Sequence, residues 1–157
     1  RYISIKEDVN EDTGTFDKDA VTPLELADTV EDIGDRVLAE VESIEREIGH
    51  APGALECEVL DLRAWAHLAH YFADKLRAGV ELETYRNGGA NEDRLENAIS
   101  ILEGAVDHWD GVVNATEGHY QEHPYATDWR EGETFSWAKY RDQVERDIEI
   151  AKREYRG

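Results

Sequence analysis

Apolar residues recur at intervals of three and four along most of this 157-residue chain, and this periodicity constrains the fold more than any other feature. Residues spaced in this way lie on one face of an α-helix, because the helix has about 3.6 residues per turn. Only three prolines are present, and each lies where a helix could begin or end. The sequence therefore predicts long amphipathic helices rather than a sheet, which would need several β-branched apolar runs.

Four segments carry this pattern. The first has a strong start, because Thr22 and Glu25 can form a capping box around a proline. We expect helices over residues 22–48, 53–86 and 91–121, and a last one from 134 or 136 to about 155. Their connections predict an all-α, four-helix up-down-up-down bundle over residues 22–157. An irregular arm or linker is expected over residues 1–21, and a start other than Met leads us to expect excision from a longer protein.

The apolar stripes of the first two helices predict which side chains form the core. On the first, the stripe comprises Leu26, Val30, Ile33, Val37, Val41, Ile44 and Ile48. On the second, it comprises Leu55, Val59, Leu62, Ala66, Ala69, Ala73, Leu76 and Val80, widened by Trp65, Leu68, Phe72 and Leu82. Because Trp65, Trp109 and Trp137 all lie on such stripes, we expect three buried indole rings.

The charge balance excludes several classes of partner. The chain has 37 acidic and 17 basic residues, a formal net charge of −20, whereas nucleic-acid binding needs a basic surface. No run of about 18 uncharged apolar residues exists, so membrane insertion is not expected. The single Cys57 excludes a disulfide scaffold. The acidic surface fits an ordinary acidic protein, and it also fits a protein from a salt-tolerant source, in which surface charge maintains solubility at high salt.

A row of polar side chains follows one line of the second helix, at alternating spacings of four and three residues. Opposite charges at these spacings can pair along a helix, so the row predicts an ion ladder on a solvated or partner-facing surface. Two other interpretations are a binding strip for an acidic or hydroxylated ligand and a dock for another domain. The row comprises Arg63, His67, His70, Asp74, Arg77 and Glu81.

Within this polar row, His67, His70 and Asp74 suggest a small metal-binding or enzymatic bundle as a further alternative. Zinc and di-iron sites in helices use motifs such as His-Glu-x-x-His or paired Glu-x-x-His, which this chain lacks. It also lacks the motifs of serine hydrolases, phosphate loops and dinucleotide sites. The sequence therefore predicts no metal, no cofactor and no catalytic residue.

Aromatic residues gather in and beside the connection over residues 122–133. Aromatic rings with polar neighbours can form a platform for sugar rings, and the alternative is that they cover the end of the helical core. The predicted glycan site comprises Tyr120, His123, Tyr125, Asp128, Trp129 and Arg130. In this site the rings would stack on the sugar, while Asp128 and Arg130 would supply hydrogen bonds.

Residues 64–79, 82–86, 102–109, 119–120 and 144–148 carry a resemblance over roughly residues 60–150. Here the chain resembles the C-terminal helical region of large bacterial carbohydrate-active proteins, which have catalytic or sugar-binding domains upstream. The resemblance implies a non-catalytic ancillary module that binds polysaccharide or docks neighbouring domains, with any catalysis in a parent domain. It also implies a secreted or periplasmic location. The alternative from the residues alone is a protein-interaction or structural bundle that binds no sugar.

Overall fold

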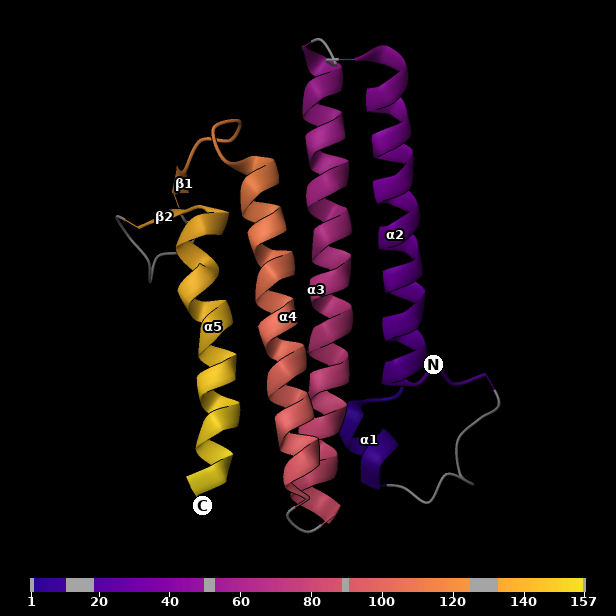
Figure 1. Ribbon diagram of the computed structural model, residues 1–157, viewed down its shortest axis with the longest axis vertical. Coiled ribbons are helices and arrows are strands. Elements are labelled where there is room, and N and C mark those ends of the chain that lie inside the picture. Colours follow the sequence, from indigo (N-terminus) through magenta and orange to yellow (C-terminus); the bar gives the residue numbers. More distant parts are fainter. Residues whose placement is uncertain (1, 11–18, 50–52, 89–90, 125–132, 157) are drawn as a thin grey trace.

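The computed structural model describes the chain except for residues 1, 11–18, 50–52, 89–90, 125–132 and 157. The prediction of an all-α bundle is confirmed (Figure 1). Four long antiparallel helices run up and down in sequence order, and a two-stranded antiparallel ladder joins the last two. The elements are α1 (Ile5–Asn10), α2 (Pro23–Ile48), α3 (Ala54–Gly88), α4 (Glu92–Thr116), β1 (His123–Pro124), β2 (Thr134–Phe135), α5 (Trp137–Arg153) and the 3-10 turn η2 (Glu154–Arg156).

The helix ends follow local signals in the sequence. Thr22 and Glu25 form the predicted capping box at the start of α2, and Asn91 and Ser136 cap α4 and α5. These side chains satisfy backbone N–H groups that have no partner within the helix. The third long helix is shorter than predicted: it ends at Thr116 rather than near residue 121. Gly118 turns the chain there with φ of 79°, a left-handed conformation that glycine adopts without strain.

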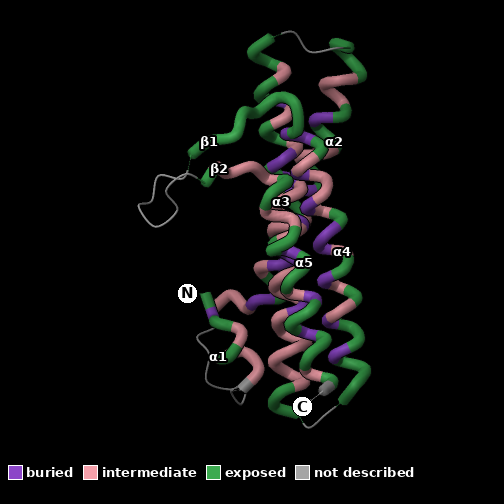
Figure 2. Tube along the Cα trace, turned by 90° about the vertical axis from the view of Figure 1, so that its left-hand side faces the viewer, coloured by how far each residue is buried: buried purple, intermediate pink, exposed green. Residues whose placement is uncertain are grey.

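The main core lies where α3, α4 and α5 meet, and Figure 2 shows buried residues along the middle of these helices. Trp109 of α4 is at its centre, with 7% of its surface exposed. Its indole N–H donates to the carbonyl oxygen of Trp137 over 3.0 Å and thereby ties α4 to the start of α5. The buried members of this core are Ala78, Leu95, Leu102, Val106, Trp109, Val144, Ile148 and Ala151.

By contrast, α2 packs on α3 through small residues. Ala27, Gly34 and Val41 are buried on α2, and they recur every seven residues. Val59, Ala66 and Ala73 do the same on α3. A Cβ added to Gly34 would lie only 3.1 Å from the Ala66 carbonyl oxygen, so the two backbones approach closely at this point. Small side chains at a helix crossing permit such a short interaxial distance.

The N-terminal arm contains a helix that we did not predict. Ser4 and Glu7 exchange hydrogen bonds as a second capping box, which starts the short helix α1. Ile3 is buried, and its N–H donates to the Val21 carbonyl oxygen, so the arm closes back on the start of α2. Ile5 packs against Gly79 of α3, because a Cβ at Gly79 would lie 2.7 Å from the Ile5 side chain.

The predicted core stripes of α2 and α3 are only partly buried. Ile33 and Ile48 are exposed, because the buried line of α2 runs through Ala27, Gly34 and Val41. This line passes beside Ile33 rather than through it. The prediction that Trp65 is a core residue is wrong: 68% of its surface is exposed, and Phe72 one heptad later is 46% exposed. Periodicity correctly gives the apolar side of each helix, but it does not say whether another helix covers that side.

Glycine packing between α3 and α4 gives a first testable prediction. A Cβ on Gly111 would lie 2.5 Å from Nδ1 of His67, whereas a Cβ on Gly104, one heptad earlier, would lie 3.7 Å from Asp74 Oδ2. We expect Gly111→Ala to lower the free energy of unfolding by about 1–3 kcal/mol through overpacking. The matched control Gly104→Ala should be neutral or raise it by up to about 1 kcal/mol. Equal stabilities of the two variants in urea unfolding would contradict this packing.

Candidate functional site

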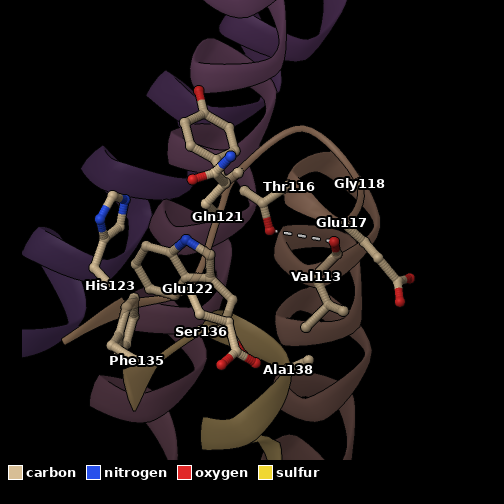
Figure 3. Close-up of a pocket in the computed structure, with 12 residues that line it drawn as sticks. Val113, Thr116, Glu117, Gly118, Gln121, Glu122, His123, Phe135, Ser136 and Ala138 are labelled. Atoms are coloured by element: carbon tan, nitrogen blue, oxygen red, sulfur yellow. Dashed lines mark hydrogen bonds between the residues drawn. The ribbon is translucent and has the colours of Figure 1, made fainter. Parts of the chain in front are cut away.

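An open cavity of about 270 Å³ lies where the end of α4 meets the start of α5 (Figure 3). Its walls come from the last turn of α4, the segment that follows it, β2 and the first turn of α5. In Figure 3, His123 and Phe135 lie on one side of the cavity and Val113 and Thr116 on the other. The lining residues are Val113, Thr116, Glu117, Gly118, Tyr120, Gln121, Glu122, His123, Phe135, Ser136, Trp137 and Ala138.

The small sheet and a polar cluster hold this cavity in shape. His123 pairs with Phe135 and Pro124 with Thr134 in the antiparallel ladder. The Thr134 hydroxyl donates to Glu122 over 2.6 Å, and the Lys139 ammonium donates to the same carboxylate over 2.7 Å. The hydrogen bond from Lys139, followed by that from Thr134, lowers the pKa of Glu122 below its ordinary value. The carboxylate is therefore charged at neutral pH and fixed at the cavity wall.

Tyr120 fixes the segment after α4 to the neighbouring helix. Its hydroxyl donates to the Asp61 carboxylate of α3, and this hydrogen bond raises the pKa of Tyr120 to about 12. Tyr120 is still 42% exposed and lines the cavity. The phenol thus presents its ring to the site while its hydroxyl is already engaged within the chain.

The other rings at the cavity belong to an aromatic series that continues into the core. The ring centroids of Phe135 and Trp137 are 5.1 Å apart and those of Trp137 and Trp109 are 5.5 Å apart, both in edge-on arrangements. Tyr71 of α3 extends the series, 5.1 Å from Trp109. Such pairs stabilise a core by about 0.5–1.5 kcal/mol each beyond the area they bury. Of these rings, Phe135 and Trp137 line the cavity, whereas Trp109 and Tyr71 belong to the core behind it.

The cavity includes only part of the glycan site predicted from the sequence. Tyr120 and His123 line it together. The other four predicted residues, Tyr125, Asp128, Trp129 and Arg130, lie outside the described residues. Thr116 is a residue that the sequence analysis missed: it is buried, and its hydroxyl donates to the backbone of α4. Its place in the last turn, one residue before the acidic Glu117, gave no signal for a binding role.

The polar row of α3 lies between the helices rather than on an open surface. On its α2 side, Arg77 makes a two-pronged ion pair with Glu31 at 2.6 and 2.9 Å and also contacts Asp28 at 2.8 Å. Arg63 contacts Glu45 at 2.7 Å. Arg77 also lies 3.7 Å from Asp74, a pair along α3 of the kind that the ion ladder predicted. The structure adds the pairs across to α2, which the spacing along one helix did not predict. Together they fix the orientation of α2 on α3.

On its α4 side, the polar row contacts residues that the sequence analysis did not single out. Glu81 accepts hydrogen bonds from Arg94 at 2.8 Å and from Asn97 at 3.0 Å. Asp74 lies 3.6 Å from Nε2 of His108. To bind another protein, the polar row would first have to lose these partners within the chain. Its position between the helices therefore does not favour the interpretation as a partner-facing surface.

Three histidines lie together at the middle of the polar row: His67 and His70 of the row and His108 of α4, which we call the histidine stack because the rings of His70 and His108 are stacked. His70 is 7% exposed, and its ring stacks on His108 with centroids 4.9 Å apart, while the His67 ring is 6.5 Å from His108. Nδ1 of His67 and Nε2 of His70 have no hydrogen-bond partner among the described residues. Nε2 of His70 lies 3.3 Å from Asp35 Oδ1, close enough for an ion pair but without hydrogen-bond geometry.

Burial lowers the pKa values of two histidines in this stack, His67 and His108. Loss of solvent lowers the pKa of His67, and the neighbouring His108 and His70 lower it further. Burial also lowers the pKa of His108, although the nearby Asp74 opposes this effect. Burial raises the pKa of Asp74 in turn. Within the described residues, no group of three His, Cys, Asp or Glu side chains is placed so that it could hold a metal ion.

Comparison with known protein families, curated proteins and solved structures finds no match to this chain. The resemblance to carbohydrate-active proteins therefore stays a prediction. Among the described residues, no helix combines the length and the apolar character needed to cross a membrane.

The histidine stack predicts a pH-dependent stability. Because the pKa values of His67 and His108 lie below their ordinary 6.5 in the folded chain, the unfolded chain binds more protons as the pH falls through 6.5. The free energy of unfolding should therefore decrease between pH 7.5 and pH 5.5, as thermal melting would show. The raised pKa of Asp74 acts in the opposite direction, but only toward the acidic range of carboxyl groups.

The double variant His67→Gln/His108→Gln should flatten this pH dependence. The matched control is His119→Gln, which removes an exposed histidine and should leave the dependence as in the wild type. An unchanged pH profile in the double variant would show that other groups cause the effect.

Proposed function

We propose that this chain is a non-catalytic helical module that binds a single sugar unit of a polysaccharide in the cavity between α4 and α5. The observation that carries this proposal is the composition of the cavity wall. Rings from His123, Phe135 and Tyr120 lie beside hydroxyl, amide and carboxylate groups around an open space of about 270 Å³. Small-molecule sites combine apolar walls with a few placed polar groups, usually in about 300–1,000 Å³. The smaller volume here suits one ring rather than a large ligand.

The charges at the cavity favour a neutral sugar. Glu117 and Glu122 both line it, and the only ammonium in contact with them among the described residues, that of Lys139, is already paired with Glu122. A carboxylated or sulfated sugar would therefore meet unfavourable charge. Gln121 and Ser136 can donate and accept hydrogen bonds, as neutral hydroxyl groups require.

A glycan array that contains neutral and acidic polysaccharides, followed by calorimetry on any positive ligand, tests the proposal. We expect a neutral glycan to bind, and Phe135→Ala to weaken its binding by about tenfold through the loss of an aromatic contact. Because Phe135 also packs on Trp137, the exposed His123→Ala is a second variant that leaves this packing in place.

The matched control is Phe72→Ala, which removes an exposed phenylalanine of α3 that does not line the cavity. It should leave glycan binding unchanged. Binding that survives both cavity variants, or an array on which the folded chain binds nothing, would refute the sugar site.

A protein-interaction bundle is the second candidate function. The polar row of α3 does not support it, because that row is engaged with α2 and α4. Its support comes from the opposite side of α3, where Trp65 is exposed.

A further inference from the structure

Several large apolar side chains of α2 and α3, most of them exposed, lie on one side of the helix pair, which we call the apolar face. Trp65 is its most exposed member, at 68%, although tryptophan side chains of soluble proteins are on average highly buried. Clustered exposed apolar groups on a stable chain usually mark an interaction site. The apolar face comprises the exposed Ile33 and Ile48 and the half-buried Ile44 of α2, together with the exposed Leu62, Trp65 and Phe72 of α3.

Helix geometry places these residues on the same side of the α2–α3 pair. Asp28 and Asp35 of α2 reach the polar row of α3, on the side that also contacts α4. Ile33 and Ile44 project from α2 on the other side of the buried line through Ala27, Gly34 and Val41. On α3, Trp65 and Phe72 likewise lie away from the polar row. The pair therefore has a polar side that is covered and an apolar side that is open.

A short helix of the chain itself already covers one end of this side. Phe72 follows Trp65 by one heptad, and Gly79 follows Phe72 by another, so all three lie along one line of α3. Ile5 of α1 packs on Gly79 in the C-terminal half of α3. Figure 1 shows α1 beside α3, near the start of α2. The line of apolar residues continues beyond α1 toward the other end of α3. The part of this line that α1 leaves uncovered is long and narrow, so a second helix would fit it.

The acidic residues beside the apolar face indicate which charge a bound helix would carry. Glu40 and Glu47 continue the heptad line of Ile33 on α2, and Glu58 precedes Trp65 by one heptad on α3. All three carboxylates are exposed, and no salt bridge to them occurs among the described residues. The whole chain has a net charge of −20, so a second copy or an anionic membrane would bring like charge to this rim.

We propose that the apolar face binds an amphipathic helix of a partner protein, whose apolar stripe packs on Trp65 and Phe72 and whose basic residues face the acidic rim. Binding of this type uses anchors at helical spacing that enter an apolar groove. The inference does not depend on the sugar site, which lies at the α4–α5 junction and shares none of these residues.

The test uses a fluorescent amphipathic peptide made of leucine and lysine, with anisotropy as the readout and the full chain as the receptor. We expect saturable binding that weakens as salt is raised. A scrambled peptide of the same composition and a leucine–glutamate peptide should bind at least about tenfold more weakly. Trp65→Ala/Phe72→Ala should reduce the affinity by about tenfold or more, because both side chains are exposed and removing them spares the core.

Two matched controls separate this proposal from general attraction between opposite charges. Glu40→Gln/Glu47→Gln should weaken binding more than Asp142→Asn/Glu149→Gln, which makes the same change in net charge on exposed residues of α5. His123→Ala, at the sugar cavity, should leave peptide binding unchanged.

Three results would overturn the proposal. They are equal binding of the leucine–glutamate peptide, unchanged affinity of the Trp65→Ala/Phe72→Ala variant, and self-association of the chain in sedimentation that this variant abolishes. The last result would show that a second copy covers the apolar face.

Discussion

The close contact between α2 and α3 determines which surfaces this protein can offer. Alanine, glycine and valine at heptad spacing bring the two backbones together, and they leave no room for large apolar side chains at the crossing. The larger residues of α2 are therefore displaced to one side of the contact. Charged residues occupy the other side, where Arg77 and Arg63 pair with α2. The contact between α2 and α3 thus has the covered polar row on one side and the open apolar face on the other.

The polar row and the main core have different roles. The core of α3, α4 and α5 supplies apolar burial around Trp109. The ion pairs and the histidine stack specify how α2 and α4 sit on α3, because a shift of one residue would leave Arg77 and Glu81 without their partners. Arg77 is partly buried, and polar contacts that are at least partly buried favour one register over another. The cavity at the α4–α5 junction depends on the core, since Trp137 joins the two.

Much of the fold could be predicted from the sequence, because capping signals and periodicity are local. The capping box of Thr22 and the apolar stripes gave the number, order and starts of the long helices. The second capping box, Ser4 with Glu7, has the same local signature and starts α1. The exposure of Trp65 could not be predicted, since the apolar periodicity of a helix is the same whether or not another helix covers its apolar face. The partners of the polar row and the role of His108 depended on contacts between helices, which single-helix spacing does not contain.

Helix α3 is enclosed on the sides that face α2, α4 and α5, but it is open along Trp65. Oxidative footprinting with short pulses of hydroxyl radicals, read by mass spectrometry, tests this in the unmodified chain, because Trp109 is an internal reference. Trp65 is 68% exposed and Trp109 only 7%, so we expect Trp65 to be oxidised far faster at every protein concentration. Comparable protection of Trp65 and Trp109 in the dilute, folded chain would contradict the account, since it would mean that the apolar side of α3 is closed.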